Sequence, residues 1–326
     1  MNVSIKVRGS VENARQAVVE SLLPGDVLSL PLGWRNRFDR EEIASLLENY
    51  PGRSAWEPES GEFVLAAPWR HRDEVAMLAE LASVRHVRPL IDGLVERCRE
   101  KGARLVLTAE MHERQRPEFW KSVGLDPLED VISFTLTVSN GGSQVNSRLE
   151  FERVEPGNRD RIDELVVIDN TSFPWLWWNN RTEFDAYLVT GGVEVYLVKL
   201  EGRAVGYVGM TRYQGWMHLD RIAIAPRYQG HGHGRAALEF VLSRTRELGF
   251  VRVALSTQRE NRHSRSLYAA MGFQRSREND YRIYGRWLVD PRTLPGPGNG
   301  ISSDGVRSPL KDKKEPVRGQ HIRTDL

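Results

Sequence analysis

The residues with the clearest capacity for chemistry lie in a glycine-rich turn between a strand-like run and a helix-like run. The segment reads Asp220-Arg-Ile-Ala-Ile-Ala-Pro-Arg-Tyr-Gln229-Gly-His-Gly-His-Gly234-Arg-Ala-Ala-Leu238. Glycines let the backbone turn tightly and bring its N–H groups close to a ligand. The first N–H groups of a helix lack internal acceptors and carry partial positive charge. We therefore predict a site for a pyrophosphate at this turn.

Three known glycine-loop patterns compete for this segment. A Walker loop requires Lys and then Ser or Thr where Arg235 and Ala236 stand. A dinucleotide fingerprint can be counted from Gly232, but the following strand supplies no acid for a ribose hydroxyl, which disfavours a nicotinamide-dependent oxidoreductase. The third pattern, Gln/Arg-x-x-Gly-x-Gly/Ala, is met by Gln229, Gly232 and Gly234.

A second segment with chemical potential follows about thirty residues downstream, reading Asn261-Arg-His-Ser264-Arg-Ser-Leu-Tyr268-Ala-Ala-Met-Gly272-Phe273. Asn261 is a natural N-cap, and Tyr268 lies two helical turns later on the same face. Gly272 fits the end of this helix. Taken alone, Tyr268 would be interpreted as a core aromatic residue.

Together these segments resemble the coenzyme A loop and the second signature of the GNAT superfamily of N-acetyltransferases, and the resemblance runs from Arg148 to Leu288. It implies that the strand Met217–Ala225 splays from its neighbour and that the thioester of acetyl-CoA lies in the gap. Backbone N–H groups of this strand would then polarise the acetyl carbonyl. The implied cofactor-binding residues are Ile222, Ala223, Ile224, Gln229, Gly230, His231, Gly232, His233, Gly234, Arg235, Asn261 and Ser264.

The same resemblance gives candidate catalytic residues. Tyr268 matches the position that usually protonates the departing thiolate, and the attacking amine needs a base or a chain of waters. Period-two geometry puts His218 and Asp220 on one strand face with Ile222 and Ile224, at positions where some family members carry a base. The alternative is that Asp220 pairs with an arginine and that His218 merely closes the strand end.

Three tryptophans, Trp175, Trp177 and Trp178, stand together where the family builds one wall of the acceptor pocket. They are predicted to contact an apolar or cationic substrate, or else to pack against the N-terminal half. The histidines of the loop have no carboxylate at ligand spacing, so no metal site is expected.

Hydrophobic periodicity predicts the elements that position these residues. Strands are expected at Val193–Leu200, Ala204–Thr211 and Met217–Ala225, followed by Val251–Leu255 in parallel pairing. Helices are expected at Asp160–Ile168, Thr182–Leu188, Gly232–Leu248 and Ser264–Met271.

An internal repeat at an offset of about 147 residues indicates duplication. Arg99-Glu-Lys-Gly102 stands opposite Arg246-Glu-Leu-Gly249, and Trp120 stands opposite Tyr268. Opposite the glycine loop, Ala82–Val87 contains no glycine. We therefore predict an α/β protein of two tandem GNAT-like domains, each a mixed, mostly antiparallel sheet flanked by helices, in which the N-terminal copy has lost its coenzyme A loop. The predicted boundaries are 1–138 for that copy, 139–147 for a linker, 148–290 for the catalytic domain and 291–326 for a disordered tail.

Composition limits the remaining alternatives. Hydrophobic residues make up 40% of the 326 and charged residues 28%, which is typical of soluble globular proteins. The formal net charge of +2 gives no case for nucleic-acid binding. Apolar runs are too short to span a membrane, and the single cysteine, Cys98, excludes a disulfide framework, so a cytoplasmic location is expected.

The sequence thus predicts a cytoplasmic acyltransferase that moves an acetyl group from acetyl-CoA to a primary amine of a small molecule or peptide. The alternative is an acyl-CoA-binding sensor without catalysis. A monomer is expected, with a homodimer as the other assembly considered.

Overall fold

The structure is a computed structural model, and it describes residues 18–34, 36–111, 116–138 and 148–296. The predicted linker 139–147 lies outside the described residues, as does most of the predicted tail. The described chain forms two compact units. One holds the described residues of Met1–Ala67 and Leu78–Lys101, and the other those of Pro68–Met77 and Gly102–Leu326.

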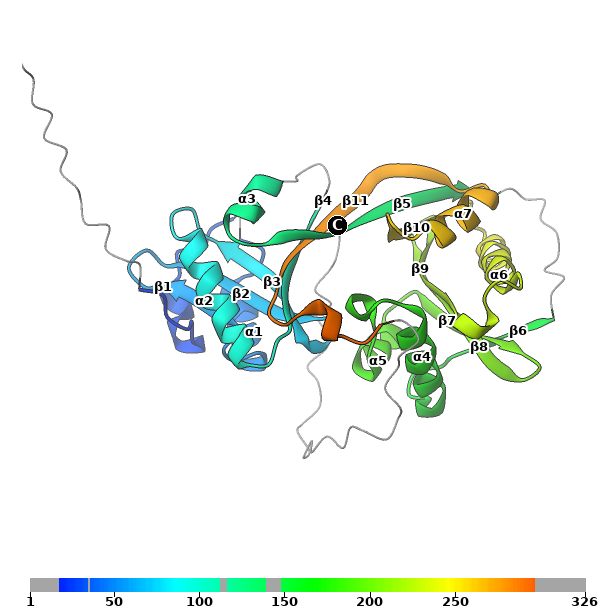
Figure 1. The fold of residues 1–326 in the computed structure, drawn as a ribbon, viewed down its shortest axis with the longest axis horizontal. Coiled ribbons are helices and arrows are strands. Elements are labelled where there is room, and N and C mark those ends of the chain that lie inside the picture. The colour runs from blue at the N-terminus through cyan, green and yellow to red at the C-terminus, as the bar shows by residue number, and fades with distance from the viewer. Residues whose placement is uncertain (1–17, 35, 112–115, 139–147, 297–326) are drawn as a thin grey trace, which may run out of the picture. The chain divides into compact units, whose positions relative to one another are not determined.

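The first unit is a small α/β arrangement (Figure 1). It contains η1 (Pro24–Ser29), α1 (Arg40–Asn49), β1 (Ser54–Glu57) and α2 (Val87–Glu100), with most of β2 (Glu62–Trp69) and the end of β3 (Arg72–Ala82). β1 and β2 pair antiparallel. The helix α1 is capped by Asp39, which forms a capping box with Glu42 and so satisfies two backbone donors that a helix start leaves free.

The second unit is built on a large mixed sheet with the strand order β4-β11-β5-β10-β9-β8-β7-β6. Neighbours pair antiparallel except β9 and β10, which are parallel, as the strand–helix–strand pattern predicted. The strands are β4 (Leu105–Met111), β5 (Asp126–Thr137), β6 (Leu149–Arg153), β7 (Val193–Leu200), β8 (Arg203–Tyr213), β9 (Trp216–Ile224), β10 (Arg252–Gln258) and β11 (Gln274–Trp287). The start of β3 extends this sheet by pairing with β4 through Val75–Met77, and this pair is also parallel.

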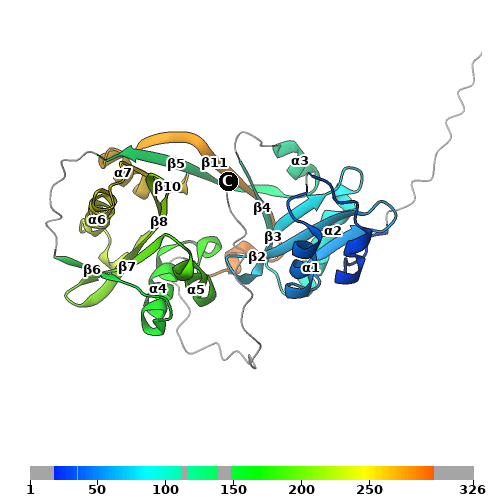
Figure 2. The ribbon, with the colours of Figure 1, turned by 180° about the vertical axis from the view of Figure 1, so that it is seen from behind.

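Helices flank this sheet, as Figure 2 shows from behind. They are α3 (Pro117–Ser122), α4 (Arg159–Ser172), α5 (Arg181–Val189), α6 (His233–Glu247) and α7 (Arg262–Ala270), with short 3-10 turns at η3 (Trp175–Trp177), η4 (Pro226–Tyr228) and η5 (Pro291–Thr293). The predicted α/β class with a mixed, mostly antiparallel sheet is confirmed. The four helices and four strands predicted between Asp160 and Met271 are confirmed to within a few residues at their ends.

The pairing of strand β5 determines which unit contains the residues that precede the predicted linker. The strand precedes the predicted linker, yet it pairs along β10 from Val131 to Thr137 and also along β11. Backbone hydrogen-bonding groups in a sheet interior need partners, and β5 supplies them to both strands. The segment Gly102–Val138 therefore belongs with the C-terminal unit, whereas the sequence placed it in a domain of residues 1–138.

The predicted tail begins differently from expectation. Pro291–Thr293 form a 3-10 turn that is capped by Asp290. The side chain of Leu294 then packs against a buried cluster that includes Trp175. Because Leu294 packs on this apolar cluster, the described chain is structured beyond residue 290.

Candidate active site

A gap in the large sheet lies between β9 and β10. The two strands pair only where Met217–Leu219 face Val253–Leu255, although β9 continues to Ile224 and β10 to Gln258. Beside this point β9 carries a bulge, because Leu219 pairs with Met210 and Arg221 with Gly209, which leaves Asp220 without a partner residue on β8. A bulge bends its strand and changes the direction of a side chain. The strands therefore part, as the family resemblance implied, beginning at Asp220.

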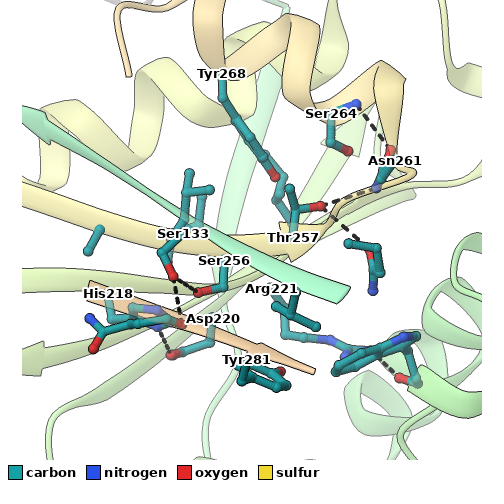
Figure 3. A pocket seen from close by; sticks show the side chains of 18 of the residues that line it. Ser133, His218, Asp220, Arg221, Ser256, Thr257, Asn261, Ser264, Tyr268 and Tyr281 are labelled. Carbon is teal, nitrogen blue, oxygen red and sulfur yellow. Dashed lines mark hydrogen bonds and ion pairs between the residues drawn. The ribbon is translucent and has the colours of Figure 1, made fainter. Parts of the chain in front are cut away.

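A pocket of about 600 Å³ opens at this gap. Its walls come from β5, β8, β9, β10, α7 and β11, together with residues of the 3-10 turn η3 and of the β2–β3 hairpin. Figure 3 shows His218, Asp220, Arg221, Ser256, Tyr268 and Tyr281 around it. All three predicted catalytic residues, Tyr268, His218 and Asp220, line this pocket.

The glycine loop lies at the start of α6. Gly230 and Gly232 have φ values of +79° and +82°, a conformation that other residues adopt only with strain. A Cβ at either position would meet nothing within 4 Å, so this face of the loop is open. Gln229 fixes the loop to the end of β9 by donating from Nε2 to the carbonyl of Ile224 at 2.8 Å. Exposed glycines before a free helix start are the features that suit a phosphate.

The predicted cofactor residues divide between two places. Ile222, Asn261 and Ser264 line the pocket. The loop residues Gln229, Gly230, His231, Gly232, His233, Gly234 and Arg235 form the turn and first residues of α6 and do not line it, and Ala223 and Ile224 are buried in the sheet. This separation is what an elongated ligand with a phosphate at one end would require.

His218 and Asp220 form a hydrogen-bonded pair. His218 Nδ1 lies 2.6 Å from Asp220 Oδ1, and Asp220 Oδ2 accepts from the hydroxyl groups of Thr211, at 2.6 Å, and Tyr187. Burial, followed by the charge of Asp220, raises the pKa of Tyr187 well above its usual range, so Tyr187 keeps its proton and donates it. Asp220 thus holds one nitrogen of the imidazole, which leaves His218 Nε2 as the nitrogen available for proton transfer.

Tyr268 projects from α7 toward the gap (Figure 3). The helix begins at Asn261, whose side chain accepts from the backbone N–H of Ser264 at 3.1 Å, as predicted for an N-cap. Tyr268 is 4% exposed, and burial raises its pKa to about 12. The phenol is therefore protonated at neutral pH and can act as an acid but not as a base.

A buried ion pair positions the tryptophan segment. Asp169, which is fully buried, accepts from Arg221, and it also accepts from Tyr207 Oη at 2.5 Å. Arg221 donates in turn to the carbonyl of Trp177 at 2.8 Å. A charge pair with its remaining donors and acceptors satisfied fixes geometry more than it adds stability. The network joins β9 to the segment that carries the three tryptophans.

The three tryptophans do not share one role. Trp177 lines the pocket, and its Nε1 donates to Glu129 Oε2 at 2.5 Å. Trp175 and Trp178 are buried in a core cluster and are not among the lining residues. Trp175 packs on Trp287 with ring centroids 5.9 Å apart. Of the three predicted substrate contacts, only Trp177 is in place to touch a ligand.

Sequence reasoning missed several residues that line the pocket. Trp69 reaches it from the end of β2, Arg70 from the turn that follows, and Tyr281 from β11. Tyr213 and Trp216 stack with centroids 4.6 Å apart at the β8–β9 turn, next to His218. The Tyr-Gln-Gly-Trp hairpin was visible in the sequence, whereas nothing local linked Trp69 to residues a hundred positions away.

No group of three or more His, Cys, Asp or Glu side chains within the described ranges could hold a metal ion. In the same ranges, no helix is both long and apolar enough to cross a membrane.

Comparison with known proteins finds similarity to acetyltransferases. Residues 159–273 match the model of the Acetyltransferase (GNAT) family. The chain is also similar to N-acetyltransferase 8 of Rattus norvegicus, with 29% identity over 111 residues, which are 32% of this chain and 50% of that protein. The chain thus matches about half the length of this relative.

Solved structures share the fold at low identity. A GCN5-related N-acetyltransferase from Kribbella flavida aligns with a TM-score of 0.58 and 13% identity over 83% of this chain and 71% of its own. A tandem GNAT protein from the clavulanic acid biosynthesis pathway aligns with a TM-score of 0.50 and 13% identity over 84% of this chain and 99% of its own. The fold therefore extends over both predicted halves. Residues 159–273, which hold the glycine loop and the strand that parts from β10, thus match the GNAT acetyltransferase family, and this match supports acyl transfer as the reaction class.

Proposed function

We propose that this protein transfers an acetyl group from acetyl-CoA to a primary amine of a small molecule or peptide. The observation that carries the proposal is the pocket where β9 and β10 part, lined on one side by the His218–Asp220 pair and on the other by Tyr268. Coenzyme A would lie with its pyrophosphate against Gly230–Gly234 and its pantetheine between the strands. The acetyl carbonyl would accept hydrogen bonds from β9 near Ile222.

In the proposed reaction, the amine nitrogen attacks the thioester carbonyl carbon, forming the C–N bond and then breaking the C–S bond. His218 Nε2 takes the proton that the amine loses, while Asp220 holds the imidazole in place. Tyr268 gives its proton to the departing thiolate. Backbone N–H groups aimed at the developing oxyanion are typically worth roughly 3 kcal/mol each in such reactions.

The N-terminal half is proposed to bind no coenzyme A of its own. Where the C-terminal half has its glycine loop, the chain bends at residues 84–86 and enters α2 without a glycine. Calorimetric titration with coenzyme A should give one site per chain, and two equivalent sites would contradict this part of the proposal.

The experiment that tests the function is a screen of primary amines with acetyl-CoA, read by thiol release and by mass spectrometry of the acetylated product. Acetylation of at least one amine class, lost in a His218→Gln variant that still binds coenzyme A, is the expected result. Coenzyme A binding without turnover of any amine would instead indicate an acyl-CoA-binding sensor.

A further inference from the structure

The turn between β2 and β3 places a cationic side chain in the acceptor pocket. This turn consists of Arg70 and His71, whose φ values of +54° and +52° lie in the left-handed region that usually calls for Asn or Gly. Residues held in this region persist where their surroundings fix them, and they concentrate at functional sites. The turn comes from the part of the sequence that was predicted to form the N-terminal domain, 1–138.

Contacts from the segment after the tryptophans hold the turn. Asn180 Nδ2 donates to the carbonyl of His71 at 2.7 Å, and His71 Nδ1 lies 2.7 Å from a carboxylate oxygen of Glu183. Arg70 Nη1 donates to Asn179 Oδ1 at 2.8 Å. The two unusual backbone conformations are thus maintained by side chains of residues 179–183.

The guanidinium of Arg70 lies between two indole rings and lacks a full set of partners. Its central carbon is 5.5 Å from the ring centroid of Trp69 and 5.4 Å from that of Trp177. Its Nε is buried and has no acceptor among the described residues. The side chain is 23% exposed and lines the pocket. A rigidly held arginine with a donor that lacks an acceptor is the kind of group that proteins use to bind a planar anion.

The charges around Arg70 leave it without a close counter-ion of its own. Glu183, at 3.8 Å, is shared with His71, whose pKa this hydrogen bond raises. The neighbouring Arg221 is itself cationic, and its carboxylate partner is Asp169. Of the described residues that line the pocket, Asp220 alone is acidic, and its oxygens accept from His218, Thr211 and Tyr187. An anionic group of a ligand that enters beside Arg70 would therefore offset its positive charge.

We infer that Arg70, held between Trp69 and Trp177, binds a carboxylate of the acceptor, so that the acceptor is a primary amine that also carries a carboxylate. This inference rests on the proposed function and names its substrate class. A carboxylate fits better than a phosphate, because one guanidinium with part of its donors already used matches two coplanar oxygens. It also gives the N-terminal sequence a role in choosing the substrate.

Matched amine pairs that differ only in the carboxylate test the inference. The pairs are phenylalanine with phenethylamine, 4-aminobutyrate with butylamine, and 4-(aminomethyl)benzoate with benzylamine, each assayed by thiol release from acetyl-CoA. In the wild-type protein, kcat/KM should be at least about tenfold higher for the carboxylate member of one or more pairs. Equal values within every pair, or a preference for the uncharged member, would overturn the inference and leave the proposed function standing.

Variants assign the preference to Arg70. Arg70→Gln should raise KM about 10- to 100-fold for the carboxylate amine and leave KM for its partner unchanged, while Arg70→Lys should retain part of the preference. Arg203→Gln, at an exposed position on β8, is the matched control and should change neither value. Equal losses on both members of a pair, in Arg70→Gln and Arg70→Lys alike, would show a purely structural role for Arg70 and contradict the inference.

A separate readout applies if no amine is acetylated, a result that would count against the proposed function. Calorimetric titration with N-acetylphenylalanine and N-acetylphenethylamine then tests the subsite without turnover. Binding of the carboxylate compound to the wild-type protein, lost in Arg70→Gln, would support the inference. Absence of binding, or equal binding by the variant, would refute it.

Discussion

Glu129 carries a partly buried carboxyl group beside the pocket wall, and its replacement by glutamine should stabilise the protein at alkaline pH. Burial raises the pKa of Glu129 from 4.5 to about 7, although the hydrogen bond from Trp177 acts in the opposite direction. This difference between the pKa of Glu129 in the unfolded chain and in the folded protein corresponds to about 3 kcal/mol in the free energy of unfolding.

The folded protein binds the proton of Glu129 more tightly than the unfolded chain does, so the free energy of unfolding falls as the pH rises. Below pH 4.5 the group is protonated in both states, and its favourable contribution is fully present. As the pH rises toward 7, the unfolded chain ionises while the folded protein keeps the proton, so the contribution is lost. Above pH 7 the folded protein holds a poorly solvated carboxylate. Glutamine has nearly the same size, stays neutral and can still accept from Trp177 Nε1.

Urea unfolding of wild type and Glu129→Gln at pH 4.5 and pH 8, followed by tryptophan fluorescence, measures this effect. The variant should be more stable than wild type by up to about 3 kcal/mol at pH 8 and nearly equal at pH 4.5. Glu150→Gln, at an exposed position of β6, is the control and should show no such difference. A variant that is less stable at pH 8, or whose difference from wild type does not change with pH, would refute the reasoning.

Three further predictions concern catalysis and coenzyme A. Tyr268→Phe keeps the packing of the ring and removes the proton, so kcat should fall about 10²–10⁴-fold with coenzyme A affinity unchanged; Tyr284→Phe, a buried tyrosine outside the pocket, should keep full turnover. His218→Gln should lower kcat by a similar factor, and Asp220→Asn by about 10²-fold, because an amide no longer holds the imidazole as the carboxylate does. Thiol-release assays measure kcat for both variants, and full activity in either would contradict the role given to that residue. Gly232→Ala places a side chain at a φ of +82°, which costs about 1–2 kcal/mol and should weaken coenzyme A binding in calorimetry, whereas unaltered affinity would exclude the loop from the site.

The glycine loop and the elements around it could be predicted from the sequence because their signals are local. The glycines of Gln229–Gly234, the N-cap at Asn261 and the apolar periodicity of α6 each act within a few residues. The alternation on β9 placed His218 and Asp220 on one face, and the structure puts both in the pocket. His218 and Asp220 are only two residues apart in the sequence, so their contact is also a local feature.

Tertiary structure alone decided which groups complete the pocket. Trp69 and Arg70 meet Trp177 across more than a hundred residues, and β5 inserts between β10 and β11 although a predicted linker follows it in the sequence. Long-range pairing depends on which strand edges and apolar surfaces remain to be covered once local elements have formed, and no short sequence pattern encodes that choice. For the same reason Trp175 and Trp178, adjacent to Trp177 in the sequence, became core residues: neighbouring side chains on a tight turn point in different directions, and only the packing around them determines which one faces a ligand.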